Sequence, residues 1–568
     1  MIGDRDAMRP EALLLDHFAA LAAAPGGVAA LRQTVLQLAV QGRLVPQDPA
    51  DEPAGVLLER IAAEKRRLVR EGKIRKAKPL PAVEEVPYAV PEGWEIVRLG
   101  EVVNYNGRQK TDPKDIPKNA WLLELEDIEK DTSRIVQRLS AGDRDPQSTK
   151  SAFKCGDVLY GKLRPYLNKV VVADGDGYCT TEIAPISIYC DILPQYLMYA
   201  LKRPEFIEYV NSKSYGMKMP RLGANDAIQA ILPLPPLPEQ HRIVAKVDAL
   251  MALCDALEAR QAEQRETHTN LGTAALAALS EAAAFEDAWA LVAGNFDLIF
   301  DSRENVAALR QTVLQLAVQG RLVPQDPADE PAGVLLERIA AEKRRLVREG
   351  VIGKVKPLPS VEEVPYAVPE GWVWTPFGNI LLEAQPGFAC GERDSNGIVQ
   401  LRMNNVNTKG NFVWDKIIRV PKETVREIEK YIIENGDVLF NNTNSVELVG
   451  KSAVFEGYSE PIVYSNHFTR LRSVNTKLLP QFIALWLNHL WNSKVFENLC
   501  NKWIGQSAVN RNKLLSLPFP LPPLPEQHRI VAKVDALMAL CDALDARIAE
   551  REEVGTKLIE AVVGSCAS

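Results

Sequence analysis

The sequence predicts an α/β (α+β) fold in which two globular domains are joined by two long helices. Two internal repeats support this fold: residues 28–72 recur without change at 306–350, and residues 233–260 recur at 520–547 with a single difference. The blocks between the repeats mix short β-rich runs with helical stretches, and each later repeat carries heptad-spaced apolar residues. Two copies of so long a unit are too few for a solenoid, so the chain is predicted to be a pseudo-two-fold repeat.

Length and composition favour an ordinary globular protein with at least two domains. The chain has 568 residues, of which 46% are hydrophobic and 25% are charged. Single hydrophobic cores stop growing at roughly 250–300 residues. The net charge of −7 excludes a basic coat over the whole surface but leaves room for local basic faces.

Cysteines, histidines and apolar segments bear on metal binding and location. The 8 cysteines have no C-x-x-C spacing and the 6 histidines have no paired spacing, so we expect no metal site. Asp4, Arg5 and Asp6 make the N-terminus a poor secretory signal, and the longest uncharged Ala/Leu stretch, near 271–280, is too short to span a bilayer. Scattered cysteines fit a reducing compartment, so the predicted location is the cytoplasm, without membrane attachment.

The first repeated block predicts two helices separated by a turn. Residues 306–318 have the apolar spacing of a helix, and the prolines of GRLVPQDPADEP then exclude one. A second amphipathic helix is predicted from Ala332 to about Glu349. The Pro-rich segments at 78–94 and 356–372, which both end in P-E-G-W, are predicted to be linkers into the variable blocks. PLPPLP before each long helix is predicted to be a stiff linker, and an SH3-type ligand is the alternative.

The variable blocks, about 101–232 and 379–519, are predicted to be distantly related α/β domains. The supporting features are GDVLY at 156–160 and GDVLF at 436–440, the β-rich runs 169–173 and 451–455, and the helical stretch 195–212.

The second repeated block predicts a long helix in each copy. Pro238 and Glu239 suit a first helical turn, and a helix from Glu239 to about Ala282 would be roughly 66 Å long at 1.5 Å per residue. We predict that the heptad seams of the two copies pair as an antiparallel coiled coil; the alternative is that each helix packs on its own domain. The seam residues are Ile243, Val247, Leu250, Cys254 and Leu257 in the first copy and Ile530, Val534, Leu537, Cys541 and Leu544 in the second.

Polar and basic residues, interleaved with aromatic residues, gather in five short segments of the variable blocks. Arg and Lys suit phosphates and guanine, whereas Asn and Gln suit the edges of adenine. Asn-rich strings are also common in turns, which is the alternative for each segment. The candidate DNA-binding residues are Lys162, Arg164, Tyr166, Asn168, Lys169, Lys213, Tyr215, Lys218, Arg221, Arg402, Asn404, Asn405, Asn441, Asn442, Asn444, Lys502, Gln506, Ser507, Asn510, Arg511 and Lys513.

Motifs for catalysis are missing from the sequence. The segment 449–452, VGKS, resembles the end of a phosphate-binding loop, but Ser445 stands where that pattern needs glycine, so we reject ATP binding. There is no N-P-P-[FY] or D-P-P-[FY] tetrapeptide of an amino-methyltransferase, no G-x-S-x-G and no H-E-x-x-H. The sequence therefore predicts a binding protein without catalytic residues of its own.

The doubled arrangement resembles one known family. Two variable domains, each introduced by P-E-G-W and closed by PLPPLPEQHRIV and a long helix, resemble the specificity subunit (HsdS) of Type I restriction–modification systems. GDVLYGKLRPYLNK, GDVLFNN and LRQTVLQLAVQGRLVPQDP also look like that family. The resemblance covers nearly the whole chain. It implies that each variable block is a target-recognition domain that reads one half of a split DNA site, and that the long helices set the gap.

The resemblance also implies partners and a division of the chain. It implies double-stranded DNA, two modification (methyltransferase) subunits and restriction (translocase/nuclease) subunits as partners. S-adenosylmethionine, ATP and Mg are then expected on those subunits, with no cofactor bound by this chain. Near-identical scaffold segments would offer two identical modification subunits the same surface. The implied segments are an N-terminal extension with the first helical region at 1–93, recognition domains at 94–236 and 372–523, a central region at 237–371 and a C-terminal spacer helix at 524–568.

Two other interpretations stay open at this point. One is a nuclease or methyltransferase fused to recognition domains, which a catalytic motif would favour. The other is a coiled-coil scaffold that binds only protein, which a lack of salt-dependent DNA binding would favour. The role of residues 1–27 is also open.

Overall fold

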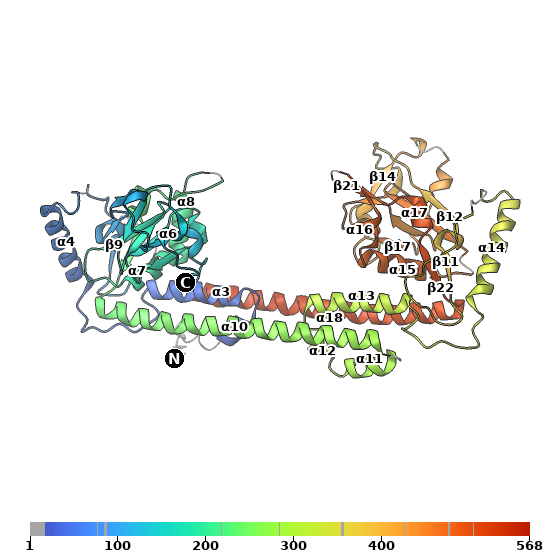
Figure 1. Cartoon of the computed structure of the whole chain (residues 1–568), viewed down its shortest axis with the longest axis horizontal. Helices are drawn as coiled ribbons and strands as arrows, with labels where there is room; N and C mark the ends of the chain where they lie inside the picture. Colours follow the sequence, from blue (N-terminus) through green and yellow to red (C-terminus); the bar gives the residue numbers. More distant parts are fainter. Residues whose placement is uncertain are drawn as a thin grey trace, which may run out of the picture. The chain divides into compact units, whose positions relative to one another are not determined.

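The computed structural model describes residues 18–76, 78–83, 88–216, 218–282, 285–353, 357–424, 427–474, 477–503 and 505–567. The chain forms two compact units (Figure 1). Unit 1 comprises Met1–Glu263 with Glu550–Ser568, and unit 2 comprises Gln264–Ala549. Of the predicted N-terminal extension, residues 1–17 lie outside the described residues. The finer division into five segments stays a prediction.

Unit 1 contains two four-stranded sheets, ordered β2-β9-β6-β7 and β3-β5-β8-β4, and the separate pair β1-β10. Its strands are β1 (Glu95–Arg98), β2 (Val103–Tyr105), β3 (Lys110–Thr111), β4 (Trp121–Leu123), β5 (Lys150–Phe153), β6 (Val158–Gly161), β7 (Val170–Val172), β8 (Gly177–Cys179), β9 (Ile183–Ile188) and β10 (Ile231–Leu234). Its helices are α2 (Phe18–Ala23), α3 (Gly27–Val40), α4 (Ala54–Arg70), α5 (Leu99–Val102), α6 (Ala141–Arg144), α7 (Pro194–Lys202), α8 (Pro204–Lys213), α9 (Ala224–Gln229) and the first part of α10 (Leu237–Glu281).

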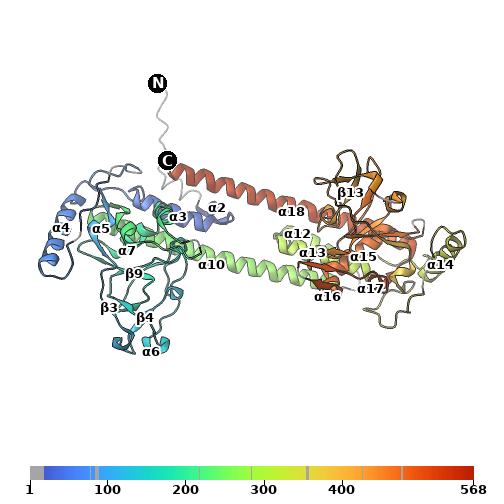
Figure 2. The same ribbon diagram turned by 90° about the horizontal axis from the view of Figure 1, so that it is seen from above.

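The sheet containing β6 separates two cores in unit 1. Successive side chains of a strand point to opposite faces. Val158 and Tyr160 accordingly lie in an inner core with α3, α7 and α10, whereas Leu159 lies in an outer core with Trp121 and Phe153 of the second sheet. Figure 2 shows this layering in unit 1, from α7 through β9 to β4.

Unit 2 repeats this architecture around the sheet β12-β19-β15-β17, the pair β11-β22 and the outer sheet β14-β13-β18, and adds a small sheet, β16-β21-β20. Its strands are β11 (Val373–Pro376), β12 (Leu381–Pro386), β13 (Ile398–Leu401), β14 (Ile418–Val420), β15 (Val438–Asn441), β16 (Thr443–Asn444), β17 (Ser452–Val454), β18 (Ile462–Tyr464), β19 (Phe468–Ser473), β20 (Asn501–Trp503), β21 (Gln506–Ala508) and β22 (Pro518–Leu521). Its helices are α11 (Phe285–Ala293), α12 (Phe296–Ile299), α13 (Arg303–Val318), α14 (Ala332–Arg348), α15 (Pro480–Asn492), α16 (Val495–Leu499), α17 (Arg511–Leu515) and most of α18, which spans Leu524–Ala567.

The predicted mixture of helix and sheet in two repeated domains is confirmed. The helices expected at 306–318, from 332 and from 239 form as α13, α14 and α10, and the two β-rich runs form β7 and β17. The helical stretch expected at 195–212 is wrong in one respect, because it is broken into α7 and α8. Arg203 has ψ 152° there, since the ring of Pro204 disfavours a helical conformation in the residue before it.

Each predicted seam is buried inside its own unit. Ile243, Val247 and Cys254 are fully buried in the inner core of unit 1, which also contains α3 and α7. The second seam is buried in the same way with α13 and α15 in unit 2. The buried seam residues therefore pack in the core of their own unit, as in the alternative arrangement. The antiparallel pairing of the two seams stays a prediction. A heptad seam predicts that a helix packs against another element, but it does not predict which one.

Both long helices contribute to both units. α10 begins in unit 1 and ends in unit 2, whereas α18 begins in unit 2 and ends in unit 1. The end of α18 supplies Val562 to the inner core of unit 1, and the end of α10 supplies Leu279 to the inner core of unit 2. Each unit is thus completed by the tail of a helix that starts in the other.

Three repeated motifs meet where each long helix starts. In unit 1, Trp94 of P-E-G-W donates its indole N–H to Glu239 of LPEQ at 2.9 Å, and Gln47 of GRLVPQ donates to the same carboxylate at 3.0 Å. Burial raises the pKa of Glu239. Unit 2 repeats these bonds at the same distances, with Glu526 as the acceptor. The repeated sequence therefore encodes a repeated hydrogen-bonded joint.

None of the helices in the part of the chain that the structure describes has the length and apolarity needed to span a bilayer.

Candidate nucleic-acid interface

Two of the predicted segments of unit 1 lie side by side. The chain leaves β6 at Lys162, whose carbonyl accepts the N–H of Leu222 at 3.0 Å, and the N–H of Arg164 is donated to Pro220 O at 2.7 Å. Segments 162–169 and 213–221, which are separate in the sequence, therefore form one surface, which we call ledge 1.

The side chains on ledge 1 are mostly exposed. Arg164, Lys213 and Lys218 are exposed and have no ion-pair partner among the described residues, and Tyr166 and Tyr215 are 46% and 64% exposed. Arg164 has φ 51°, a left-handed conformation that requires support from its surroundings. An exposed basic surface with accessible rings suits a polyanion.

Arg221 and Lys169 have partners within the protein, and Asn168 is buried with its Oδ1 unpaired. Arg221 makes a two-pronged ion pair with Glu182, at 2.9 and 3.1 Å. Asn168 is buried with φ 50°, and Lys169 donates its ammonium to Leu125 O at 2.7 Å. The structure therefore places Asn168 and Lys169 in the support beneath the ledge.

The three predicted segments of unit 2 also come together, on a surface that we call ledge 2. The carbonyl of Asn442 accepts the N–H of Val509 at 2.9 Å, and β16 pairs with β21 so that Asn444 lies opposite Ser507. Asn441 donates its amide to Met403 O at 3.2 Å, which joins the segment 402–405 to the other two.

Ledge 2 has an exposed rim and a buried polar base. The rim residues Asn404, Lys502, Gln506, Asn510, Arg511 and Lys513 are exposed. Asn405 and Asn510 also have local bonds, because Asn405 donates to Val413 O at 2.9 Å and Asn510 caps α17. In the base, four buried polar atoms have no hydrogen-bond partner: Arg402 Nε, Asn441 Oδ1, Asn442 Oδ1 and Ser507 Oγ. Buried polar groups without hydrogen-bond partners are costly and uncommon in folded proteins, so their gathering makes this base a candidate ligand-binding site.

The two ledges share one backbone frame that carries different side chains. The N–H of Lys162 bonds Glu182 O at 3.0 Å, and the N–H of Asn442 bonds His467 O at 2.9 Å. The bonds from Leu222 and Val509 complete the same pattern. Lys162 of unit 1 is therefore equivalent to Asn442 of unit 2, and Glu182 is equivalent to His467. Burial, and then the charge of Arg402, lower the pKa of His467, which favours its neutral form.

Glu182 and His467 were not among the residues predicted from the sequence. Each directly precedes a buried strand, β9 or β19, and that position is the signal that identifies them. A polar residue directly before a buried strand lies in the loop that leads into the strand, and binding residues are often found on such loops.

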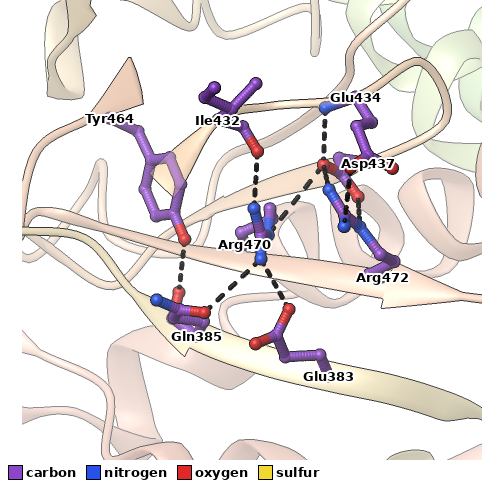
Figure 3. A network of polar contacts seen from close by, with 8 residues as sticks. All are labelled: Glu383, Gln385, Ile432, Glu434, Asp437, Tyr464, Arg470 and Arg472. Atoms are coloured by element: carbon purple, nitrogen blue, oxygen red, sulfur yellow. Dashed lines mark hydrogen bonds and ion pairs between the residues drawn. The ribbon is translucent and has the colours of Figure 1, made fainter. Parts of the chain in front are cut away.

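The shared GDVL motif supports the frame rather than the exposed ledge. The carboxylate of Asp437 accepts the backbone N–H of Glu434 at 2.8 Å and two bonds from Arg472 at 2.7 Å. Figure 3 shows this cluster with the neighbouring Arg470. Asp157 repeats the arrangement in unit 1 with Lys154 N–H and Arg108. Both carboxylates fix the turn that leads into the strand before the ledge.

Basic and amide-rich surfaces repeated on a doubled scaffold are typical of proteins that recognise DNA. The chain belongs to the family of the Type I restriction modification DNA specificity domain, whose sequence model matches residues 91–266 and 392–552. It is 34% identical to the Type I restriction enzyme EcoAI specificity subunit of Escherichia coli, over 94% of this chain and 93% of the relative. It is 32% identical to the EcoEI specificity subunit of Escherichia coli, over the same shares. The chain is thus a specificity subunit of a Type I restriction–modification system.

Among solved structures, the chain is similar to the crystal structure of the HsdS subunit from Thermoanaerobacter tengcongensis. The sequence identity is 21% and the TM-score is 0.41, and the match covers 84% of this chain and 98% of that chain.

Proposed function

We propose that ledge 1 and ledge 2 each read one half of a bipartite DNA site. The observation that carries this proposal is the shared backbone frame with different side chains. A common frame presents both ledges to DNA in the same way, whereas Lys162 and Glu182 in one and Asn442 and His467 in the other present different hydrogen-bonding groups.

The chemistry of the ledges suggests different readouts. Ledge 1 offers Arg164, Lys213 and Lys218 without ion-pair partners among the described residues, which suits phosphates and guanine. Ledge 2 offers Asn404 and Gln506 at its rim, which suit adenine, with Lys502 and Arg511 for the backbone. DNA edges reaching the base of ledge 2 would also supply partners for its unpaired amide oxygens.

We infer that the two long helices act together as the ruler for the gap between the half-sites. Both run continuously from one unit to the other, in opposite chain directions. An antiparallel arrangement of α10 and α18 is part of this proposal, with α3 and α13 filling their seams. A continuous helix transmits length at about 1.5 Å per residue.

The catalytic steps belong to partners in this proposal. The joint made by Trp94, Gln47 and Glu239 recurs in unit 2, so the chain offers the same scaffold twice, which suits two identical modification subunits. Those subunits would bring S-adenosylmethionine and methylate adenine, and restriction subunits would bring ATP and Mg for translocation and cleavage. A methyltransferase or nuclease fused to this chain, or a scaffold that binds only protein, are the alternatives.

The test exchanges side chains on one ledge at a time. The full chain is expressed with its modification subunits, and methylated adenines are mapped over a genome. Glu182→Gln with Lys162→Ala is expected to alter only one half-site, and His467→Ala with Asn442→Ala only the other. Arg338→Ala, which removes an exposed ion pair between α14 and Glu330, is the control. A change in both halves from one ledge would refute separate reading.

A further inference from the structure

Each recognition domain braces its outer layer against a long helix through one basic residue. In unit 1, Arg134 contacts Asp255 of α10 at 3.2 Å. In unit 2, Lys409 contacts Asp542 of α18 at 2.7 Å and Asp545 at 3.4 Å. Asp255 and Asp542 are the same residue of the repeated helix, so two unlike domains reach the same point on their helices.

The same acidic residues also hold the helix of the first repeated block. Arg32 of α3 contacts Asp255 at 2.5 Å and Glu258 at 2.9 Å, and its side chain is only 15% exposed. Arg310 of α13 contacts Asp542 and Asp545 in the same way, at 2.7 and 3.0 Å. Domain, repeat helix and long helix are therefore joined at one electrostatic contact in each unit.

The loop that carries Arg134 is shaped before it reaches the helix. Asp131 and Ser133 have φ 64° and 65°, in the left-handed region that few non-glycine residues adopt. The ammonium of buried Lys202, on α7, donates to Asp131 O at 2.6 Å and to Ser133 Oγ at 2.5 Å. The strain in the loop is thus supported from the inner layer of the domain.

Different residues hold the loop that carries Lys409, but this loop also brings a cation to the long helix. Asn407 Oδ1 accepts the N–H of Lys409 at 2.9 Å and that of Asn411 at 3.0 Å, and Gly410 has φ 78°. A side chain at Gly410 would come within 2.6 Å of Asn488, which lies on α15. Two different loops that deliver a cation to the same helix position indicate that the position matters to both domains.

We propose that Arg134 and Lys409 are positioning residues that fix the angle of each recognition domain on its long helix, and so the gap that the subunit accepts. The inference rests on the proposed ruler. Each loop connects bridged residues of the outer core, Ile128 with Ile135 and Val406 with Phe412, so the brace holds the outer layer of the domain. Without it, that layer tilts more freely and the ledge covers a wider range of DNA positions.

The test compares substrates that differ only in gap. DNA duplexes carry the native half-sites at the native gap and at one base pair less or more, and the full complex with modification subunits methylates them. Arg134→Glu and Lys409→Glu are each expected to lower the preference for the native gap by about threefold to tenfold, with half-site preference unchanged. Arg134→Lys keeps most of the preference. The control is Arg338→Glu, which removes an exposed ion pair between α14 and Glu330.

Salt gives a readout that a purely structural role would not produce. Exposed ion pairs are screened by salt, so raising the ionic strength should relax the gap preference of the wild-type chain and leave the Glu variants nearly unchanged. Wild-type gap preference in both Glu variants would overturn the proposal, as would a loss of half-site preference along with gap preference. Lengthening both helices tests the ruler separately. If that insertion changes the recognised gap but the Glu variants keep the wild-type gap preference, the ruler stands and only the role of Arg134 and Lys409 is rejected.

Discussion

Trp94 and Glu239 are 145 positions apart in the sequence and are joined by a 2.9 Å hydrogen bond from the indole N–H to a largely buried carboxylate. The same bond joins Trp372 and Glu526 in unit 2. This bond explains why P-E-G-W and LPEQ recur together, since each motif supplies one half of the contact.

Replacing Trp94 or Trp372 by phenylalanine should destabilise the chain. Each change removes one donor from a buried carboxylate, which typically costs about 1–3 kcal/mol of unfolding free energy. The measurement is denaturant unfolding of the full chain. Trp374→Phe is the matched control, because the indole N–H of Trp374 is buried without a partner, so its loss should cost less. Equal losses in all three variants would contradict the role of the bond.

His489 should make unit 2 sensitive to acid. It lines a cavity of about 400 Å³ with Tyr366, Trp374 and Trp486, and burial lowers its pKa to about 4. Between pH 4 and about 6.5 the unfolded chain then binds more protons at this site than the folded chain, so stability falls as the pH falls through this window.

Unfolding of wild-type and His489→Gln chains at pH 7.0 and 4.5 tests this expectation, and the wild type should lose more stability on acidification. His528→Gln is the control, because His528 is exposed. An equal acid sensitivity of the wild type and His489→Gln would exclude His489 as the cause.

Lys502 and Arg511 should contribute to DNA affinity through phosphates. Both are exposed at the rim of ledge 2. Changing either to alanine should weaken binding of the complex to all sequences alike and reduce the slope of log affinity against log salt by about one. Asn442→Ala should instead reduce discrimination at one half-site and leave the salt slope unchanged. Binding titrations at several salt concentrations distinguish these outcomes.

Lengthening both long helices should lengthen the recognised gap. Four residues inserted between Glu263 and Gln264 and four between Ala549 and Glu550, where each helix passes from one unit to the other, add about 6 Å of helix and roughly 400° of rotation. One base pair is about 3.4 Å, so the gap should grow by one or two base pairs with both half-sites unchanged. The methylation map of the variant is the readout, and an active variant that keeps the original gap would reject the ruler.

Much of the fold follows from the sequence because the repeat is nearly exact. The bounds of α13, α14 and α10 are readable from apolar spacing and proline, both of which act locally. The partner of each seam is not readable, because Ile243 faces α3 and α7 through contacts that the heptad pattern leaves unspecified. The break at Arg203 was readable in principle, since Pro204 stands next to it.

The candidate site was predicted as separate segments and not as a surface. The segments containing Lys162 and Arg221 were identified by their basic and aromatic residues, but their adjacency depends on backbone hydrogen bonds between distant parts of the chain. Glu182 and His467 carry no motif, and only the frame reveals them. Asn168 and Lys169 matched the pattern by composition, yet their conformation and bonds place them beneath the ledge.

The tail of α18 packs in the inner core of unit 1, and this has a consequence for the order of synthesis. Residues 550–567 leave the ribosome well after residue 263, by which point the other residues of unit 1 have all been translated. At about 5–20 residues per second, the intervening stretch takes on the order of 15–60 s to translate. During that interval the apolar surface that later packs against Val562 has no cover. The inner core of the nascent unit 1 can therefore be completed only after the tail of α18 has been translated.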